Sequence, residues 1–145
     1  MSHDPHILGV YAEDRSVLER VSPEFLKRGV ERAQEKTKKV AHEIKSELKP
    51  GMNEDEGRKL ALDIFLSHGV KKHWHRPHVR FGPGTRLNFN HPMQLEHSLQ
   101  LGDHYYLDLG PVWKDEESGI EYEGDFGDTW IFDRESNSSD CIQSA

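Results

Sequence analysis

The 145-residue chain has the length of one domain, and its 34% hydrophobic and 31% charged residues are typical of a globular protein rather than a disordered one. No apolar run approaches a membrane-spanning length and the N-terminus lacks a signal-peptide pattern, so we expect a cytoplasmic protein with no membrane partner. The net charge of -7 argues against nucleic acid as a partner. The single cysteine, Cys141, excludes an internal disulfide.

The N-terminal part of the sequence predicts an extension followed by a long helix. Residues 1–21 show no sustained periodicity, and we interpret them as an N-terminal extension that ends in a short helical turn. Ser22 is a suitable N-cap because Pro23 follows it at the first helical position. Apolar residues then recur with helical spacing as far as Leu48, and Pro50 ends the helix.

A second helix is predicted to begin after Asn53. Glu56 follows three residues later, which completes a capping-box pattern, and acidic residues gather in the first turn, where the helix dipole favours them. We expect this helix to end at Gly69.

Beyond Gly69 the sequence changes to short runs rich in aromatic and β-branched residues. The segment 114–121 is charged and contains Ser118-Gly119, so we interpret it as a loop between two strands. Two helices followed by a meandering antiparallel sheet predict an α+β fold. The predicted strands are 79–81, 86–89, 105–112 and 129–132.

Two aspartates are candidate metal ligands. Asp108 lies inside a run of large β-forming residues, where an unpaired carboxylate would be very costly to bury. If the strands on either side of the charged loop form a hairpin, Asp108 and Asp125 can face the same side of the sheet. Convergent carboxylates suit a divalent cation such as Mn, Co, Fe or Zn.

Several motifs in order along the chain resemble a known family. Gly-Asp-x4-Asp-x-Gly, which contains Asp108, and Tyr-x-x-Asp-x-x-x-Thr, which contains Asp125, are similar to the two-aspartate signature of pita-bread-fold metallopeptidases. That family includes methionine aminopeptidase, Xaa-Pro aminopeptidase and dipeptidase, and creatinase-like proteins. Residues 49–54 resemble the turn between the family's two leading helices, and residues 80–82 resemble the strand and glycine that follow.

The resemblance implies a fold, an activity and a set of site residues. It covers residues 22–133, which we expect to form the first half of the pita-bread fold. Asp108 and Asp125 fall on two metal ligands, and His91 in Asn90-His91-Pro92 falls on the catalytic histidine that contacts substrate. The implied reaction removes the N-terminal residue of a peptide substrate with water bridged between two divalent metal ions.

The sequence also departs from the family pattern. The family completes its metal centre with a histidine and two glutamates from the second half of the fold, but no histidine follows His104 here. We therefore expect the C-terminal half to be missing, residues 134–145 to be a polar tail, and metal binding by this chain alone to be weak. Asp128 adds a further carboxylate and leaves Asp125 and Asp128 as alternatives for the second ligand.

A histidine cluster lies before the first predicted strand. His73 and His75 would share a face of an extended strand, but Pro77 leaves the direction of His78 open. The cluster could bind a transition metal by itself, but the family's metal ions do not lie on this segment. We interpret the cluster as the mouth of a substrate cleft, with Trp74 and His78 as substrate-binding residues.

Two further interpretations remain beside the enzyme. The chain could be a non-catalytic pita-bread relative that binds peptides or proteins through the same cleft. It could also be a truncated remnant whose exposed sheet must form a homodimer or pair with a second chain that supplies the other half.

Overall fold

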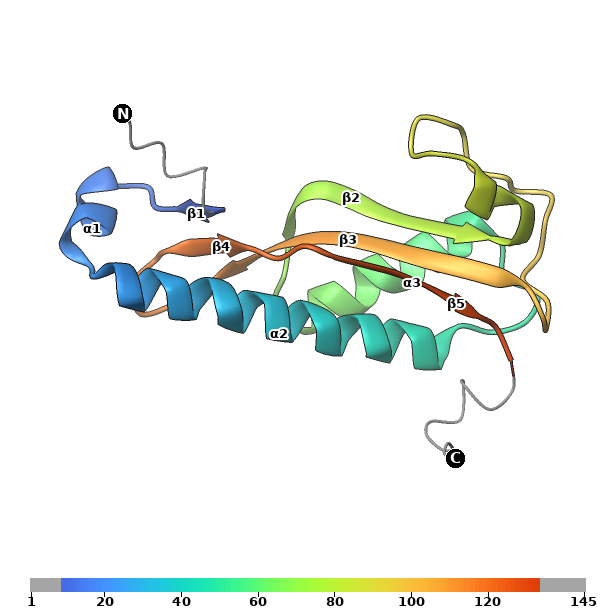
Figure 1. The fold of residues 1–145 in the computed structure, drawn as a ribbon, viewed down its shortest axis with the longest axis horizontal. Coiled ribbons are helices and arrows are strands. Elements are labelled where there is room, and N and C mark those ends of the chain that lie inside the picture. The colour runs from blue at the N-terminus through green and yellow to red at the C-terminus, as the bar shows by residue number, and fades with distance from the viewer. Residues whose placement is uncertain (1–8, 134–145) are drawn as a thin grey trace.

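The computed structural model describes residues 9–133, in which helices pack on one face of an antiparallel sheet (Figure 1). The predicted α+β fold is therefore confirmed, while the predicted polar tail at 134–145 lies outside the described residues. None of the described helices combines the length and the apolar character that crossing a membrane requires. The elements in chain order are β1 (Val10–Tyr11), α1 (Arg15–Arg20), α2 (Pro23–Glu47), α3 (Glu54–Ser67), β2 (Lys72–Phe81), the 3-10 helix η2 (Gly82–Arg86), β3 (His104–Lys114), β4 (Glu121–Glu123) and β5 (Phe126–Ile131).

Both long helices begin at the caps that the sequence predicts. The Ser22 hydroxyl accepts a hydrogen bond from the Phe25 amide at the start of α2. Asn53 and Glu56 form the predicted capping box, with two hydrogen bonds of 2.9 Å. Beyond the end of α3, Gly69 has a φ of 84°, a conformation that glycine adopts without steric cost.

Strand β3 is the centre of the sheet. Strand β2 pairs with it on one side, antiparallel, and β5 pairs on the other side over residues 104–109. Strand β4 pairs with the end of β3, over residues 112–114, and β1 adds to β4. The chain between β4 and β5 therefore leaves the sheet opposite the middle of β3.

Residues 9–21 are attached to this sheet. They supply β1 and α1, and Val10 is buried in the common core. The short helical turn predicted near the end of this region is confirmed by α1. The boundary that we predicted at residue 22 stays a prediction about domain organisation.

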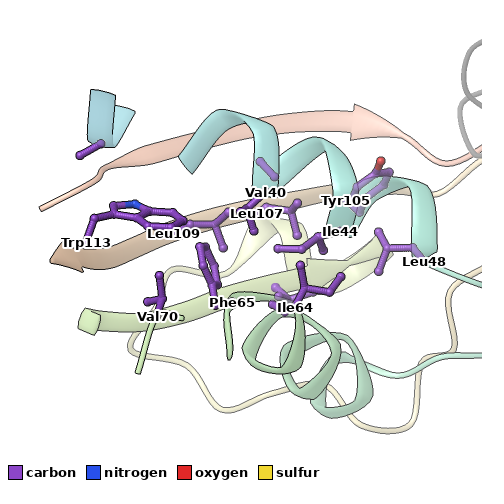
Figure 2. Close-up of a cluster of buried hydrophobic side chains, with 14 of the residues drawn as sticks. Val40, Ile44, Leu48, Ile64, Phe65, Val70, Tyr105, Leu107, Leu109 and Trp113 are labelled. Atoms are coloured by element: carbon purple, nitrogen blue, oxygen red, sulfur yellow. The ribbon is translucent and has the colours of Figure 1, made fainter. Parts of the chain in front are cut away.

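The core lies between the sheet and the two long helices (Figure 2). Side chains of β3 alternate between the two faces, and Tyr105, Leu107 and Leu109 are fully buried against the helices. From the helices, Ile44 and Phe65 pack on them. The opposite face of β3 carries the intervening residues, Asp108 among them, and within residues 9–133 neither long helix packs on it.

A buried ion pair joins α3 to the end of β2. Arg80 Nη1 lies 3.1 Å from Glu54 Oε1, and the two residues are only 4% and 0% exposed. Glu54 also accepts hydrogen bonds from the backbone amides of Phe81 and Gln94, at 3.0 and 2.8 Å. The carboxylate is thus satisfied by three donors, which offsets the cost of removing it from water.

The same arginine explains why the predicted strand at 86–89 is wrong. Residues 82–86 form η2, and the chain then crosses as a loop to β3. Arg80 donates to the backbone carbonyls of Asn88, His91 and Pro92, at 2.8, 2.6 and 2.9 Å. Asn88 lies in the predicted strand, and because the Arg80 side chain binds its carbonyl, that group is not used in a β-ladder. The predicted strands at 79–81, 105–112 and 129–132 are confirmed as parts of β2, β3 and β5, although Phe132 follows the last strand residue.

Substitution of Arg80 tests how much the ion pair with Glu54 matters for stability. We expect Arg80→Met to lower the free energy of unfolding by about 3 kcal/mol or more, because it leaves the buried Glu54 carboxylate without its charge partner. Urea denaturation of the full chain measures the change. Arg28→Met, at an exposed position of α2, is the matched control and should change stability by less than about 0.5 kcal/mol. Equal stability of the two variants would contradict the assigned role of the pair.

A second prediction concerns the contact between α2 and β4 at Gly29. A Cβ atom at this position would lie 2.2 Å from Cζ of Tyr122. Alanine is favoured over glycine in a helix by about 1 kcal/mol, but we expect Gly29→Ala to destabilise the chain because the tyrosine ring must move. In a Tyr122→Ala background the same substitution should become stabilising. Urea denaturation measures both effects. If Gly29→Ala stabilised the chain with Tyr122 present, the predicted clash with the tyrosine ring would be wrong.

Candidate metal centre

Asp108 lies in the middle of β3, on the face that the helices leave uncovered. Its neighbours across the sheet are His78 in β2 and Gly127 in β5. Because directly paired residues share a face, His78 and Asp108 point to the same side. Gly127 has no side chain, so it does not cover the Asp108 carboxylate on the β5 side. A Cβ atom at residue 127 would lie 3.5 Å from Asp108 Oδ1.

Asp125 lies in the connection between β4 and β5. Hydrogen bonds to α2, β3 and β2 hold this connection. The Asp125 amide donates to Gln34 Oε1 of α2 at 2.6 Å, and the Gly124 amide donates to the Pro111 carbonyl of β3 at 2.8 Å. The indole of Trp74 in β2 donates to the Gly124 carbonyl, also at 2.8 Å. The connection is therefore fixed at both of its residues, and Asp125 itself remains exposed.

The register of the sheet separates Asp125 from the alternative ligand Asp128. Asp128 pairs with Leu107, which faces the helices, whereas Asp108 pairs with Gly127. Asp128 therefore belongs to the opposite face of the sheet from Asp108. Of the two alternatives, the register favours Asp125.

Two irregularities in β2 redirect its histidines. His73 pairs with Pro111, His75 with Gly110 and His78 with Asp108, so β2 has an extra residue in each of the two intervals. His73 and His75 consequently face opposite sides, and our expectation that they share a face is wrong. His73 packs edge-on against Phe65 in the core, and burial lowers its pKa.

His75 joins the two aspartates on the open face. Its Nε2 atom lies 3.5 Å from Asp108 Oδ1, and one donor atom from each of His75, Asp108 and Asp125 falls within 4.8 Å of the other two. The imidazole lies close over β3 because Gly110 has no side chain: a Cβ there would be 2.6 Å from His75 Cδ2. Two carboxylates and an imidazole are a donor set that fits a divalent transition-metal ion.

The sequence interpretation did not foresee that His75 would join the aspartates. The available signal was the pair of prolines, Pro77 within β2 and Pro111 in β3, which pairs with His73. Proline inside a strand is confined to edges and bulges, so both residues indicate that simple alternation fails in this part of the sheet.

The residues predicted to contact substrate lie beside this cluster. His78 and His91 line one cavity of about 220 Å³ together with Phe89. The His78 ring stacks on His75 at 5.0 Å and lies 5.6 Å from Phe89, and burial lowers its pKa. A chain of ring contacts therefore connects the cavity to the cluster.

Trp74 and His91, two of the residues predicted to contact substrate, are both exposed. The Trp74 side chain is partly exposed and lies edge-on to His75 at 4.4 Å, besides holding Gly124. His91 is exposed, and its Nδ1 atom lies 3.0 Å from Asn88 Oδ1. The tryptophan thus has a structural contact with the connection that carries Asp125, in addition to its exposed surface.

The helices on one face and the open, aspartate-bearing other face define a partial pita-bread fold of the metallopeptidase class. The sequence model of metallopeptidase family M24 matches residues 28–143, and the chain belongs to this family. Membership implies the use of divalent metal. Among curated proteins, no match is found.

Solved structures of several peptidases share the fold. A histidine-to-alanine variant of Escherichia coli aminopeptidase P is 25% identical with a TM-score of 0.59, over 77% of this chain and 23% of that one. Proline aminopeptidase P II from Yersinia pestis is 24% identical (TM-score 0.60; 78% and 24%), and X-Pro aminopeptidase from Thermotoga maritima is 17% identical (TM-score 0.57; 88% and 31%). The chain thus spans about a quarter to a third of the length of these proteins.

The position of the Asp125 connection can be tested through Gln34. We expect Gln34→Ala to accelerate hydrogen exchange of the Asp125 amide about 5-fold or more, because the substitution removes its acceptor. NMR exchange on the full chain measures the rate, and Glu35→Ala, at the next and exposed position of α2, is the control. An unchanged rate in Gln34→Ala would show that the glutamine does not hold the connection.

Proposed function

We propose that this chain contributes the two-aspartate part of the metal centre of an aminopeptidase, which hydrolyses the N-terminal bond of peptides of the Xaa-Pro type. The observation that carries the proposal is the convergence of Asp108 and Asp125 on the open face of the sheet in a member of metallopeptidase family M24. The named functions of the structural neighbours, aminopeptidase P and X-Pro aminopeptidase, support this choice of substrate class.

Asp108 and Asp125 are the proposed ligands of the metal ion. Their donor atoms suit Mn, Co, Fe or Zn and do not select one of them. When bound, such an ion activates water and polarises a carbonyl group. The protein supplies fixed positions for its ligands: Asp108 is held in the ladder of β3 and Asp125 by the contacts of its connection. Ligands held in this way need little rearrangement on binding.

His91 is the proposed catalytic contact to the substrate, and His78 and Trp74 are proposed to line its path. The supporting observation is the shared cavity of His78 and His91, which adjoins the cluster through the stack on His75. At about 220 Å³ the cavity is smaller than the usual pocket for a small molecule, so it suits a single terminal residue. His91 can then donate a hydrogen bond to the peptide or accept a proton.

The alternative is a non-catalytic module that binds peptides with the same face. For either function we propose a peptide as the substrate or ligand, and a second copy of this chain or a chain that supplies the other half of the fold as the protein partner. Within residues 9–133, β5 has one strand neighbour only, so its second edge can accept such a partner. The cytoplasmic location stays a prediction.

Calorimetric titration of the metal-stripped chain with Mn²⁺ and Co²⁺ tests the centre directly. We expect binding that is weakened at least about 10-fold by Asp108→Ala combined with Asp125→Ala, because both carboxylate ligands are lost. Asp128→Ala is the control that removes a carboxylate from the other face of the sheet. Equal binding by all three proteins would refute the proposed ligands.

The same samples, loaded with metal, separate the enzyme from the binding module. The enzyme should release the first residue of a short Xaa-Pro peptide, and chelation of the metal should stop the reaction. Peptide binding without release at any metal loading would instead support the non-catalytic module.

A further inference from the structure

We propose that His75 is a third protein ligand of this centre and binds the metal through Nε2. The inference rests on the metal centre of the proposed function and adds a residue that the two-aspartate signature does not contain. It gives the described part of the chain a site of two carboxylates and one imidazole, contributed by β2, β3 and the connection between β4 and β5.

The hydrogen bond on the far side of the ring presents Nε2 as a ligand. His75 Nδ1 lies 2.7 Å from the backbone carbonyl of Arg76, and a carbonyl oxygen can only accept. The proton of the neutral imidazole therefore resides on Nδ1, and Nε2 keeps its lone pair. Metal-binding histidines very commonly show this arrangement, with the other ring nitrogen donating to a carbonyl or carboxylate.

The distance between Nε2 and Asp108 agrees with a shared ion. Two ligand atoms that each lie about 2.0–2.1 Å from one metal are about 3.4 Å apart in tetrahedral geometry. The Nε2 to Oδ1 distance of 3.5 Å is close to this value and long for a direct hydrogen bond. The third donor, from Asp125, falls within 4.8 Å of both, which small side-chain rotations can close.

The surroundings of His75 keep its ring in place. Gly110 beneath it provides the space for the imidazole, Trp74 contacts it edge-on, and His78 stacks on it with an interplanar angle of 12°. None of these contacts occupies Nε2. The ring is therefore held by its faces, edge and Nδ1, while the remaining nitrogen is directed at the aspartates.

An imidazole ligand also narrows the metal preference. Oxygen donors alone suit Mg²⁺ and Ca²⁺ as well as Mn²⁺, whereas imidazole favours first-row transition metals. We therefore expect the site to bind Co²⁺ or Zn²⁺ more tightly than Mg²⁺, and three protein ligands leave coordination positions for water or substrate.

The test uses metal affinity and a spectroscopic signature of the ligand atom. The metal-stripped chain and its His75→Gln variant are titrated with Co²⁺ by calorimetry at about pH 8, above the usual imidazole pKa of about 6.5. We expect the variant to bind at least about 10-fold more weakly. Pulsed EPR of the Mn²⁺-loaded wild-type chain with ¹⁵N-labelled histidine should show a directly coordinated histidine nitrogen, absent from His75→Gln. Absence of the nitrogen signal from the wild-type chain overturns the proposal by itself, and loss of the signal in the variant assigns it to His75.

His104→Gln is the matched control, because His104 is an exposed histidine at the start of β3. This variant should keep both the affinity and the nitrogen signal. Binding that depends on Asp108 but shows no histidine nitrogen would overturn the assignment of His75 and leave the two-aspartate centre standing. Failure of the wild-type chain to bind any of the ions would overturn both.

Discussion

The buried ion pair between Glu54 and Arg80 is the interaction on which the arrangement of the site depends. It fixes the start of α3 against the end of β2, and the same guanidinium holds the carbonyls of the loop that carries His91. A buried charge pair contributes little to stability relative to an apolar pair of the same shape, but it tolerates few alternative geometries. Its role in this fold is therefore to specify position: it fixes the loop that carries His91 against the end of β2, and this loop lines the cavity together with His78.

The second constraint is the interruption opposite the middle of β3. Strands β4 and β5 pair with different parts of β3, and the connection between them passes the point where Gly110 and Pro111 lie. Asp125 projects from this interruption, and His75 approaches Gly110 from the other side through a bulge of β2. The candidate ligands thus converge where the regular β-ladder of β3 is interrupted on both sides, by the bulges of β2 and by the connection between β4 and β5. Irregular backbone of this kind is common beside active sites because it redirects side chains without disturbing the core.

The sequence was sufficient where the determining interactions are local. The caps of α2 and α3 depend on residues within four positions of each other, such as Ser22 with Phe25, and were predicted correctly. The strand predicted at 86–89 failed because the Arg80 side chain binds the Asn88 carbonyl, a contact that the local sequence pattern does not specify. The two aspartates are predicted as ligands from ordered motifs, and the structure brings them close together, but the approach of His75 depends on two bulges and on the pairing of β2 with β3, which no local pattern specifies.

The core and the candidate centre occupy opposite faces of the same sheet, and this separation bears on how metal binding relates to folding. The helices bury Tyr105, Leu107 and Leu109 on one face, so the sheet has a packed core that includes none of the three candidate ligands. Asp108 is held by the β-ladder, and Asp125 is held through the hydrogen bond that its backbone amide donates to Gln34. The candidate ligands are therefore positioned by contacts of the sheet and of α2, whereas the fold of a small zinc domain depends on its ion. Because the core lies on the other face, substitution of a candidate ligand is expected to leave the packing of the helices on the sheet in place.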